Sequence, residues 1–184
     1  MNQTHNGSKM SNQNSKTRDA VLENTLRVYF TNQHGPKTMF LNVLFHRSPV
    51  SLRLLDYLCT NYAKNRSSGY EITIMGAKKT FQIYQSYKEQ LRHYSKKMFD
   101  PFCRRDRIAL NLFDDAQRAW VRVVTTVGQL NFFRWCIYYQ VIDYAVAHKD
   151  DIEKDMNNTV QKRSTKNMAK SKTKPVMGSF EVKF

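Results

Sequence analysis

The stretch of residues 125–147 limits the possible folds of this chain more than any other part of its sequence. Its apolar residues recur at intervals of three and four, the spacing of one face of an α-helix, and others extend that surface most of the way round. A helix that is apolar on nearly every side is buried in a protein core or in a membrane. Polar residues interrupt this stretch, and no apolar run approaches the roughly 18 residues of a membrane span. We therefore predict the central core helix of a soluble domain.

The polar residues of this stretch carry two further expectations. Thr126 precedes Gln129 by three positions, which is the spacing of a capping box. The Thr126 hydroxyl would accept a hydrogen bond from the Gln129 amide, and the Gln129 side chain would reach back to the Thr126 amide. Arg134 and Asp143 need a partner or a place at the helix rim, because an unpaired buried charge is costly. We expect a structural ion pair.

Length and composition indicate one domain with flexible ends. The chain has 184 residues, of which 41% are hydrophobic and 12% aromatic, enough for a sizeable core. We expect a disordered polar leader at 1–22, a globular domain at 23–157 and a basic flexible tail at 158–184. The three scattered cysteines make a poor disulfide framework and fit a reducing compartment. The polar first residues do not form a secretory signal, so the protein is not expected to be secreted.

Hydrophobic periodicity predicts an α+β fold, with short antiparallel strands packed on about three helices. The strands are expected in three hairpins, at 25–31 with 39–45, at 70–75 with 79–83, and at 108–113 with 120–124. Besides the core helix, two helices are expected, one that starts at Ser48 and one over 84–98. Tyr84, Tyr87 and Tyr94 step along one face of the second helix, and we interpret this stripe as core rather than a base-stacking platform.

The charge balance points to an anionic partner. The formal net charge is +15 at pH 7, and an excess of this size repels itself in the folded state. Lysines and arginines neutralise phosphates and release counterions, so nucleic acid is the favoured partner. The candidate phosphate contacts lie in the 84–98 helix, in the segment after it and in the tail: Lys88, Arg92, Lys96, Lys97, Arg104, Arg105, Arg107, Lys162, Arg163, Lys166, Lys170, Lys172 and Lys174.

Two other interpretations of these charges stay open. They are also compatible with a solvated surface over the tyrosine core, or with a structural or interaction protein that binds an acidic protein partner. No groove-reading motif is present, so any nucleic-acid binding is expected to be independent of sequence.

Catalysis and metal binding are not expected. The cysteines and histidines lack the paired spacing of a zinc site, and no glycine-rich loop cradles a phosphate, so we expect neither a metal nor a cofactor. His93, Asp100 and Cys103 match no mechanism-bearing motif. An enzyme would need them gathered in one cleft. Cys59 and Cys136 are expected to be reduced core residues.

Four stretches in order resemble a small uncharacterised protein family of the nucleocytoplasmic large DNA viruses. They are 53–58 with 60–64, 99–105, 125–135, and the start of the lysine-rich tail at 162–166. The resemblance covers most of residues 25–166. It implies a viral protein of the infected-cell cytoplasm, of a replication or assembly site, or of the virion. It also implies that the partner is viral nucleic acid, with DNA ahead of RNA, or a capsid component of the virion. The resemblance does not identify a catalytic residue.

Overall fold

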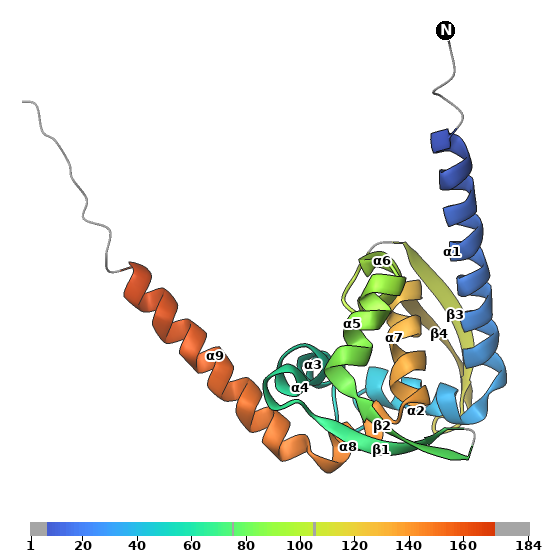
Figure 1. Ribbon diagram of the computed structural model, residues 1–184. Helices are drawn as coiled ribbons and strands as arrows, with labels where there is room; N and C mark the ends of the chain where they lie inside the picture. Colours follow the sequence, from blue (N-terminus) through green and yellow to red (C-terminus); the bar gives the residue numbers. More distant parts are fainter. Residues whose placement is uncertain (1–6, 75, 105, 172–184) are drawn as a thin grey trace, which may run out of the picture.

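Helix α7 (Val127–Tyr138) runs through the centre of the domain (Figure 1), as the sequence predicted. The computed structural model describes residues 7–74, 76–104 and 106–171. Phe132 and Phe133 are fully buried. The Thr126 hydroxyl accepts the Gln129 amide at 3.1 Å, which confirms half of the capping box. The reciprocal half is wrong, because Oε1 of Gln129 instead accepts the Thr125 hydroxyl at 2.5 Å.

The core helix is interrupted after Tyr138. Gln140 adopts a left-handed conformation with φ of 57°, and a second helix, α8 (Val141–Ala147), follows it. The prediction of one helix over 125–147 is therefore wrong at this point. The interruption turns the chain, so the faces of α7 and α8 are not continuous.

The first predicted hairpin is wrong, because both of its strands are helical. Residues 25–31 lie in α1 (Gly7–Asn32), which also contains most of the segment expected as a polar leader, and residues 39–45 lie largely in α2 (His34–Leu44). Leu26 and Phe30 are one helical turn apart and fully buried, whereas Val28 is half exposed. Over so short a window, the spacing of these apolar residues fits the period of a strand as well as the period of a helix. The packing of Leu26 and Phe30 against the core selects the helix.

A helical run follows, but it begins at Leu52 and not at Ser48 as predicted. It comprises α3 (Leu52–Tyr57), a π-helical turn η1 (Leu58–Tyr62) and α4 (Ala63–Arg66). The Ser51 side chain caps its start by accepting the Leu54 amide at 3.2 Å.

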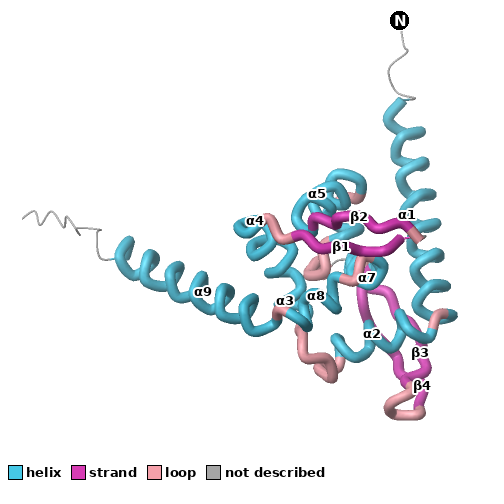
Figure 2. The backbone as a smooth tube through the Cα atoms, turned by 60° about the horizontal axis from the view of Figure 1, so that its bottom comes forward, coloured by secondary structure: helices cyan, strands magenta, loops and turns pink. Residues whose placement is uncertain are grey.

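The other two hairpins are confirmed, and they form separate two-stranded antiparallel sheets. The first pairs β1 (Gly69–Ile74) with β2 (Ala77–Gln82), and the second pairs β3 (Arg107–Asp114) with β4 (Ala119–Thr126). Gly76 lies in the first turn with φ of 80°, a conformation that suits glycine. Both views place the hairpins on different sides of α7 (Figures 1 and 2). The fold is thus the predicted α+β class, with more helix than expected.

The helix expected over 84–98 is two helices. α5 (Ile83–His93) ends where Tyr94 becomes extended, with φ of −105° and ψ of 142°, and the short α6 (Lys96–Phe99) follows. Phe99, the last residue of α6, and Pro101 after it are both buried. This break moves the later part of the predicted basic row to another element.

The last helix, α9 (Lys149–Ser171), leaves the domain on the side away from α1 (Figure 1). Residues 158–171, expected as a flexible tail, belong to this helix, and 172–184 lie outside the described residues. The Tyr57 hydroxyl joins α9 to the domain through Oδ2 of Asp155 at 2.7 Å and the Thr159 hydroxyl at 2.8 Å.

Candidate nucleic-acid interface

Two of the predicted cations lie exposed on α5. Lys88 and Arg92 point away from the domain, while Ile83 and Tyr87 of the same helix are buried. Because the helix ends at Tyr94, Lys88 and Arg92 do not continue into the next two lysines of the predicted row.

Those next two lysines have acidic neighbours. Nζ of Lys96 lies 3.6 Å from Oδ2 of Asp100, and Nζ of Lys97 lies 2.6 Å from Oδ2 of Asp106. The hydrogen bond that Lys97 donates to the Asp106 carboxylate raises the pKa of Lys97. Lys96 and Lys97 are therefore partly neutralised by the protein itself and are weaker candidates for phosphate contact than the sequence indicated.

Two predicted arginines meet at one hollow. Arg104 and Arg107 line a hollow of about 290 Å³, together with Phe102 of the connecting turn and Val124 of β4. The residue between them in the predicted cluster, Arg105, lies outside the described residues. In both views α7 lies between α5 and the β3–β4 hairpin (Figures 1 and 2). These arginines are thus separated from Lys88 and Arg92.

The outward side of the β3–β4 hairpin extends this hollow into a longer surface. We call it the hairpin face, formed by Arg107 and Asn111 of β3 and by Trp120, Arg122 and Val124 of β4. Trp120 is 70% exposed and Val124 is 56% exposed. Asn111 is paired directly with Arg122 across the strands. The face combines an exposed indole with guanidinium groups.

Sequence reasoning missed Trp120 and Arg122, although it placed both in a strand. The signal was available in the alternation of residues along 120–124. Val121 and Val123 alternate with the two missed residues, and successive side chains of a strand point to opposite faces. If the valines face the core, Trp120 and Arg122 face outward.

The tail cations lie far from the hairpin face. Lys162 is exposed on α9, which extends from the opposite side of the domain in both views (Figures 1 and 2). The backbone of Arg163, Lys166 and Lys170 belongs to the same helix. Lys172 and Lys174 lie outside the described residues.

The interpretation of the tyrosine stripe as core is confirmed. Tyr87 is 7% exposed, and its ring centroid lies 5.7 Å from that of Phe99 and 6.1 Å from that of Trp135. Burial raises the pKa of the Tyr87 hydroxyl far above its usual range. Tyr84 and Tyr94 are partly buried against the same core. The buried Tyr87 ring therefore offers no free face for a base.

The groups considered for catalysis or metal binding are dispersed. His93 lines one cavity and Cys103 lines another, and the Asp100 carboxylate accepts the Phe102 amide at 2.8 Å. Within the described ranges, no three histidine, cysteine, aspartate or glutamate side chains gather as metal ligands. Cys59 and Cys136 are buried free thiols, as predicted, and burial raises the pKa of Cys136.

The predicted Arg134–Asp143 ion pair is not formed. Nη2 of Arg134 donates to Oδ1 of Asn131 at 2.8 Å, while Asp143 is exposed on α8, beyond the interruption at Gln140. No helix among residues 7–74, 76–104 and 106–171 is long and apolar enough to cross a membrane.

Comparison with known proteins finds a family match over nearly the whole chain. Residues 3–180 match the family of unknown function DUF7197. "Uncharacterized protein L507" of Acanthamoeba polyphaga mimivirus is 33% identical over 162 residues, which are 88% of this chain and 62% of the mimivirus protein. The chain thus corresponds to less than two thirds of that relative. No solved structure matches. The resemblance found from the four sequence stretches is confirmed, and the chain belongs to DUF7197, an uncharacterised protein family of large DNA viruses.

Proposed function

We propose that this protein is a non-enzymatic nucleic-acid-binding protein that holds single-stranded DNA on its hairpin face without reading its sequence. The observation that carries the proposal is the placement of Trp120. Its indole is 70% exposed and lies on the same face as Arg122. Leaving so large an apolar ring in water forgoes the free energy of burying it. Base–aromatic stacking is worth about 1–3 kcal/mol per base and accepts every base.

The arginines near Trp120 supply the electrostatic part of the interaction. Within the described residues, no ion pair with a carboxylate involves Arg104, Arg107 or Arg122. All three are exposed. Their guanidinium groups are therefore open to phosphate oxygens, which they can contact through two parallel hydrogen bonds. In this respect they differ from Lys96 and Lys97.

The shape of the face favours a single strand over a duplex. From Trp120 to Val124 the strand β4 covers roughly 14 Å at 3.4 Å per residue. The stacking ring is at one end and the hollow with Arg104 and Arg107 at the other. A base can reach the face of an indole only when it is unstacked, as in a single strand. The α9 lysines and arginines would add attraction that does not depend on sequence.

The proposed setting follows from the viral family. A large DNA virus supplies DNA as the polymer, which is why we place DNA ahead of RNA. The proposed sites of action are the host-cell cytoplasm, where the virus replicates or assembles, and the virion. Roles accessory to replication or late expression fit this activity.

Tryptophan fluorescence tests the proposal directly, because the chain has two tryptophans in contrasting environments. Trp120 is 70% exposed and Trp135 is 4% exposed. Titration of the full chain with a thymidine oligonucleotide should quench the Trp120 emission. In Trp120→Leu the remaining Trp135 emission should stay constant, and the affinity for a labelled oligonucleotide should fall by about 5–150-fold.

Salt dependence provides the second half of this test. If several phosphates are neutralised, the affinity should fall steeply between about 50 and 200 mM salt. A flat response, or no binding at low salt, would rule the proposal out. Co-purification with capsid proteins from nuclease-treated virions would instead support the acidic-protein partner.

A further inference from the structure

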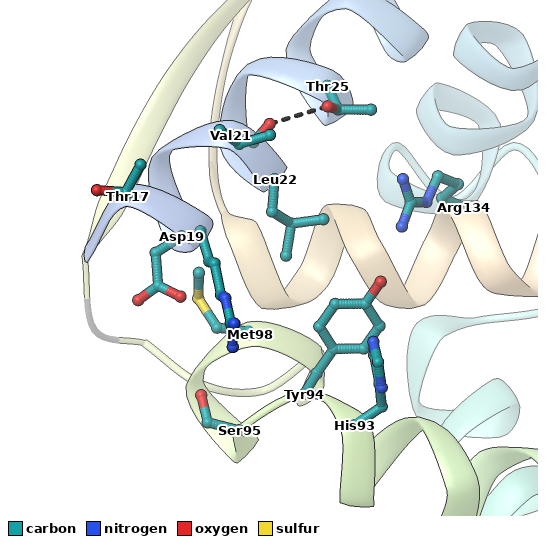
Figure 3. A pocket seen from close by; sticks show the side chains of 11 residues that line it. Thr17, Asp19, Val21, Leu22, Thr25, His93, Tyr94, Ser95, Met98 and Arg134 are labelled. Atoms are coloured by element: carbon teal, nitrogen blue, oxygen red, sulfur yellow. Dashed lines mark hydrogen bonds between the residues drawn. The ribbon is translucent and has the colours of Figure 1, made fainter. Parts of the chain in front are cut away.

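A cavity of about 850 Å³ lies between α1 and the α5–α6 segment (Figure 3). This volume is in the range of small-molecule sites. Leu22 of α1, Tyr94 of the α5–α6 junction and Arg134 of α7 converge on the space, as Figure 3 shows. The cavity shares no lining residue with the hairpin face or with the hollow beside it, and its proposed role does not depend on nucleic-acid binding.

Arg134 is the unusual member of this lining. It is half-buried on a helix that is otherwise buried on most sides, and Asp143, the carboxylate expected beside it, lies exposed on α8. In the described part of the chain its one hydrogen bond goes to the neutral amide of Asn131. A guanidinium group has five N–H donors. Most of them are therefore left without a protein acceptor, and a half-buried charge without an opposite charge is costly.

Asn131 holds this guanidinium in position. The Asn131 side chain is 1% exposed and uses both ends of its amide. Nδ2 donates to the Met98 carbonyl at 2.9 Å, and Oδ1 accepts from Arg134 at 2.8 Å. Asn131 thereby joins two walls of the cavity, since Met98 and Arg134 both line it. A guanidinium fixed in this way loses little conformational entropy when a ligand binds.

The remaining walls define the ligand. Leu22 and Met98 are apolar, and Tyr94 presents a ring that is stacked on Phe99 with centroids 6.2 Å apart and planes 13° apart. These surfaces suit an aromatic or aliphatic body. Asp19 lies at the opposite end of the cavity from Arg134 (Figure 3). Arg18 also lines the cavity, and its charge offsets that of Asp19, so the positive charge of Arg134 is left over and suits a ligand with one anionic group.

We propose that this cavity is a binding site for a small molecule that has an apolar or aromatic body and a single anionic group, and that Arg134 binds the anion. Asn131 is a positioning residue, because it acts through Arg134.

Two fluorescent probes that differ in one anionic group test this site in the full chain. The first is 1-anilinonaphthalene-8-sulfonate, and the second is the uncharged N-phenyl-1-naphthylamine. The sulfonate should bind one molecule per chain. Arg134→Gln retains a donor for Asn131 but removes the charge, and should weaken sulfonate binding about 10-fold or more, because hydrogen bonds to charged groups contribute about 1.5–3 kcal/mol. Arg134→Lys should restore part of the affinity. The affinity for the uncharged probe should change less than about 2-fold.

A second pair of variants keeps the test decisive if Arg134→Gln does not fold, as judged by loss of cooperative thermal unfolding. Thr25 and Val28 are both exposed on α1, but only Thr25 lines the cavity. Thr25→Phe should narrow the cavity and reduce binding of both probes, whereas Val28→Phe should leave it unchanged. Absence of sulfonate binding to the folded wild-type chain would overturn the proposal. So would sulfonate affinity that is the same in the folded wild-type, Arg134→Gln and Thr25→Phe chains.

Discussion

The Arg47 guanidinium donates two parallel hydrogen bonds to the Asp114 carboxylate, from Nη1 to Oδ1 at 3.1 Å and from Nη2 to Oδ2 at 2.9 Å. Asp114 is 2% exposed and ends β3, and the Ala116 amide also donates to its Oδ1 at 3.1 Å. Arg47 follows α2, so this contact ties the tip of the β3–β4 hairpin to the helical part of the domain. It thereby helps to orient the hairpin face.

This contact should make stability depend on pH. The hydrogen bond from Arg47 lowers the pKa of Asp114 below its usual value of 3.8. A carboxyl whose pKa is lower in the folded state contributes stability above its unfolded pKa and loses it as the pH falls through the folded pKa. Arg47→Gln should therefore lower the free energy of unfolding at pH 7 by about 1–3 kcal/mol. The difference from wild type should shrink below about pH 4. Urea unfolding at a series of pH values measures it.

The matched control is Arg66→Gln. Arg66 is half exposed. Its guanidinium lies 3.4 Å from the Asp155 carboxylate and 4.7 Å from the centroid of the Tyr62 ring, so its loss should change stability by about 1 kcal/mol or less at any pH. A difference between Arg47→Gln and wild type that persists unchanged at pH 2 would contradict the assignment to Asp114.

Two glycines in helices should respond oppositely to alanine. A Cβ on Gly128 would lie 2.7 Å from the Lys97 carbonyl oxygen and 2.9 Å from that of Asp100, both of which are backbone atoms. Gly128→Ala should cost about 1–3 kcal/mol through overpacking of α7 against α6. A Cβ on Gly35 meets nothing within 4 Å, so Gly35→Ala should be neutral or stabilise α2 by up to about 1 kcal/mol. Thermal unfolding of the two variants compares these effects, and equal melting temperatures would refute the close packing at Gly128.

Free and paired cations should differ in their contribution to DNA binding. Arg122 is on the hairpin face without a carboxylate partner in the described residues, whereas Lys97 is bound to Asp106. Arg122→Gln should reduce the slope of log affinity against log salt by about 1, as expected for the loss of one phosphate contact. Lys97→Gln should leave that slope nearly unchanged. Fluorescence anisotropy across a salt series gives both slopes, and the reverse order would disprove the assignment of the interface to the hairpin.

The Tyr57 hydroxyl should control how firmly α9 is held. It contacts Asp155 and Thr159 of α9, so Tyr57→Phe should lower stability by about 0.5–1.5 kcal/mol. Amide hydrogen exchange should become faster around residues 152–162 and stay constant in α7. Tyr138→Phe is the control, because Tyr138 is 55% exposed. Uniformly faster exchange throughout the domain would argue against a local role for Tyr57.

The sequence by itself determined the parts of the fold that depend on local signals. Runs of strand-forming residues on either side of Gly76 and of residues 115–118 specify the two hairpins, because turn residues and strand propensity act over short distances. The apolar stretch that Thr126 caps specifies the buried α7 for the same reason. The family was also recognisable from sequence stretches alone.

Only the tertiary structure decided what depends on residues far apart in the chain. Short apolar segments such as 25–31 fit a strand or a helix, and packing against the core selected the helix of α1. The break at Tyr94 divided the predicted basic row, and Lys97, which lies after the break, pairs with Asp106. Whether a cation is free, neutralised or, like Arg134, placed in a cavity depends on which neighbours folding brings to it. That information is absent from spacing along the chain, because charge pairing and burial act through space.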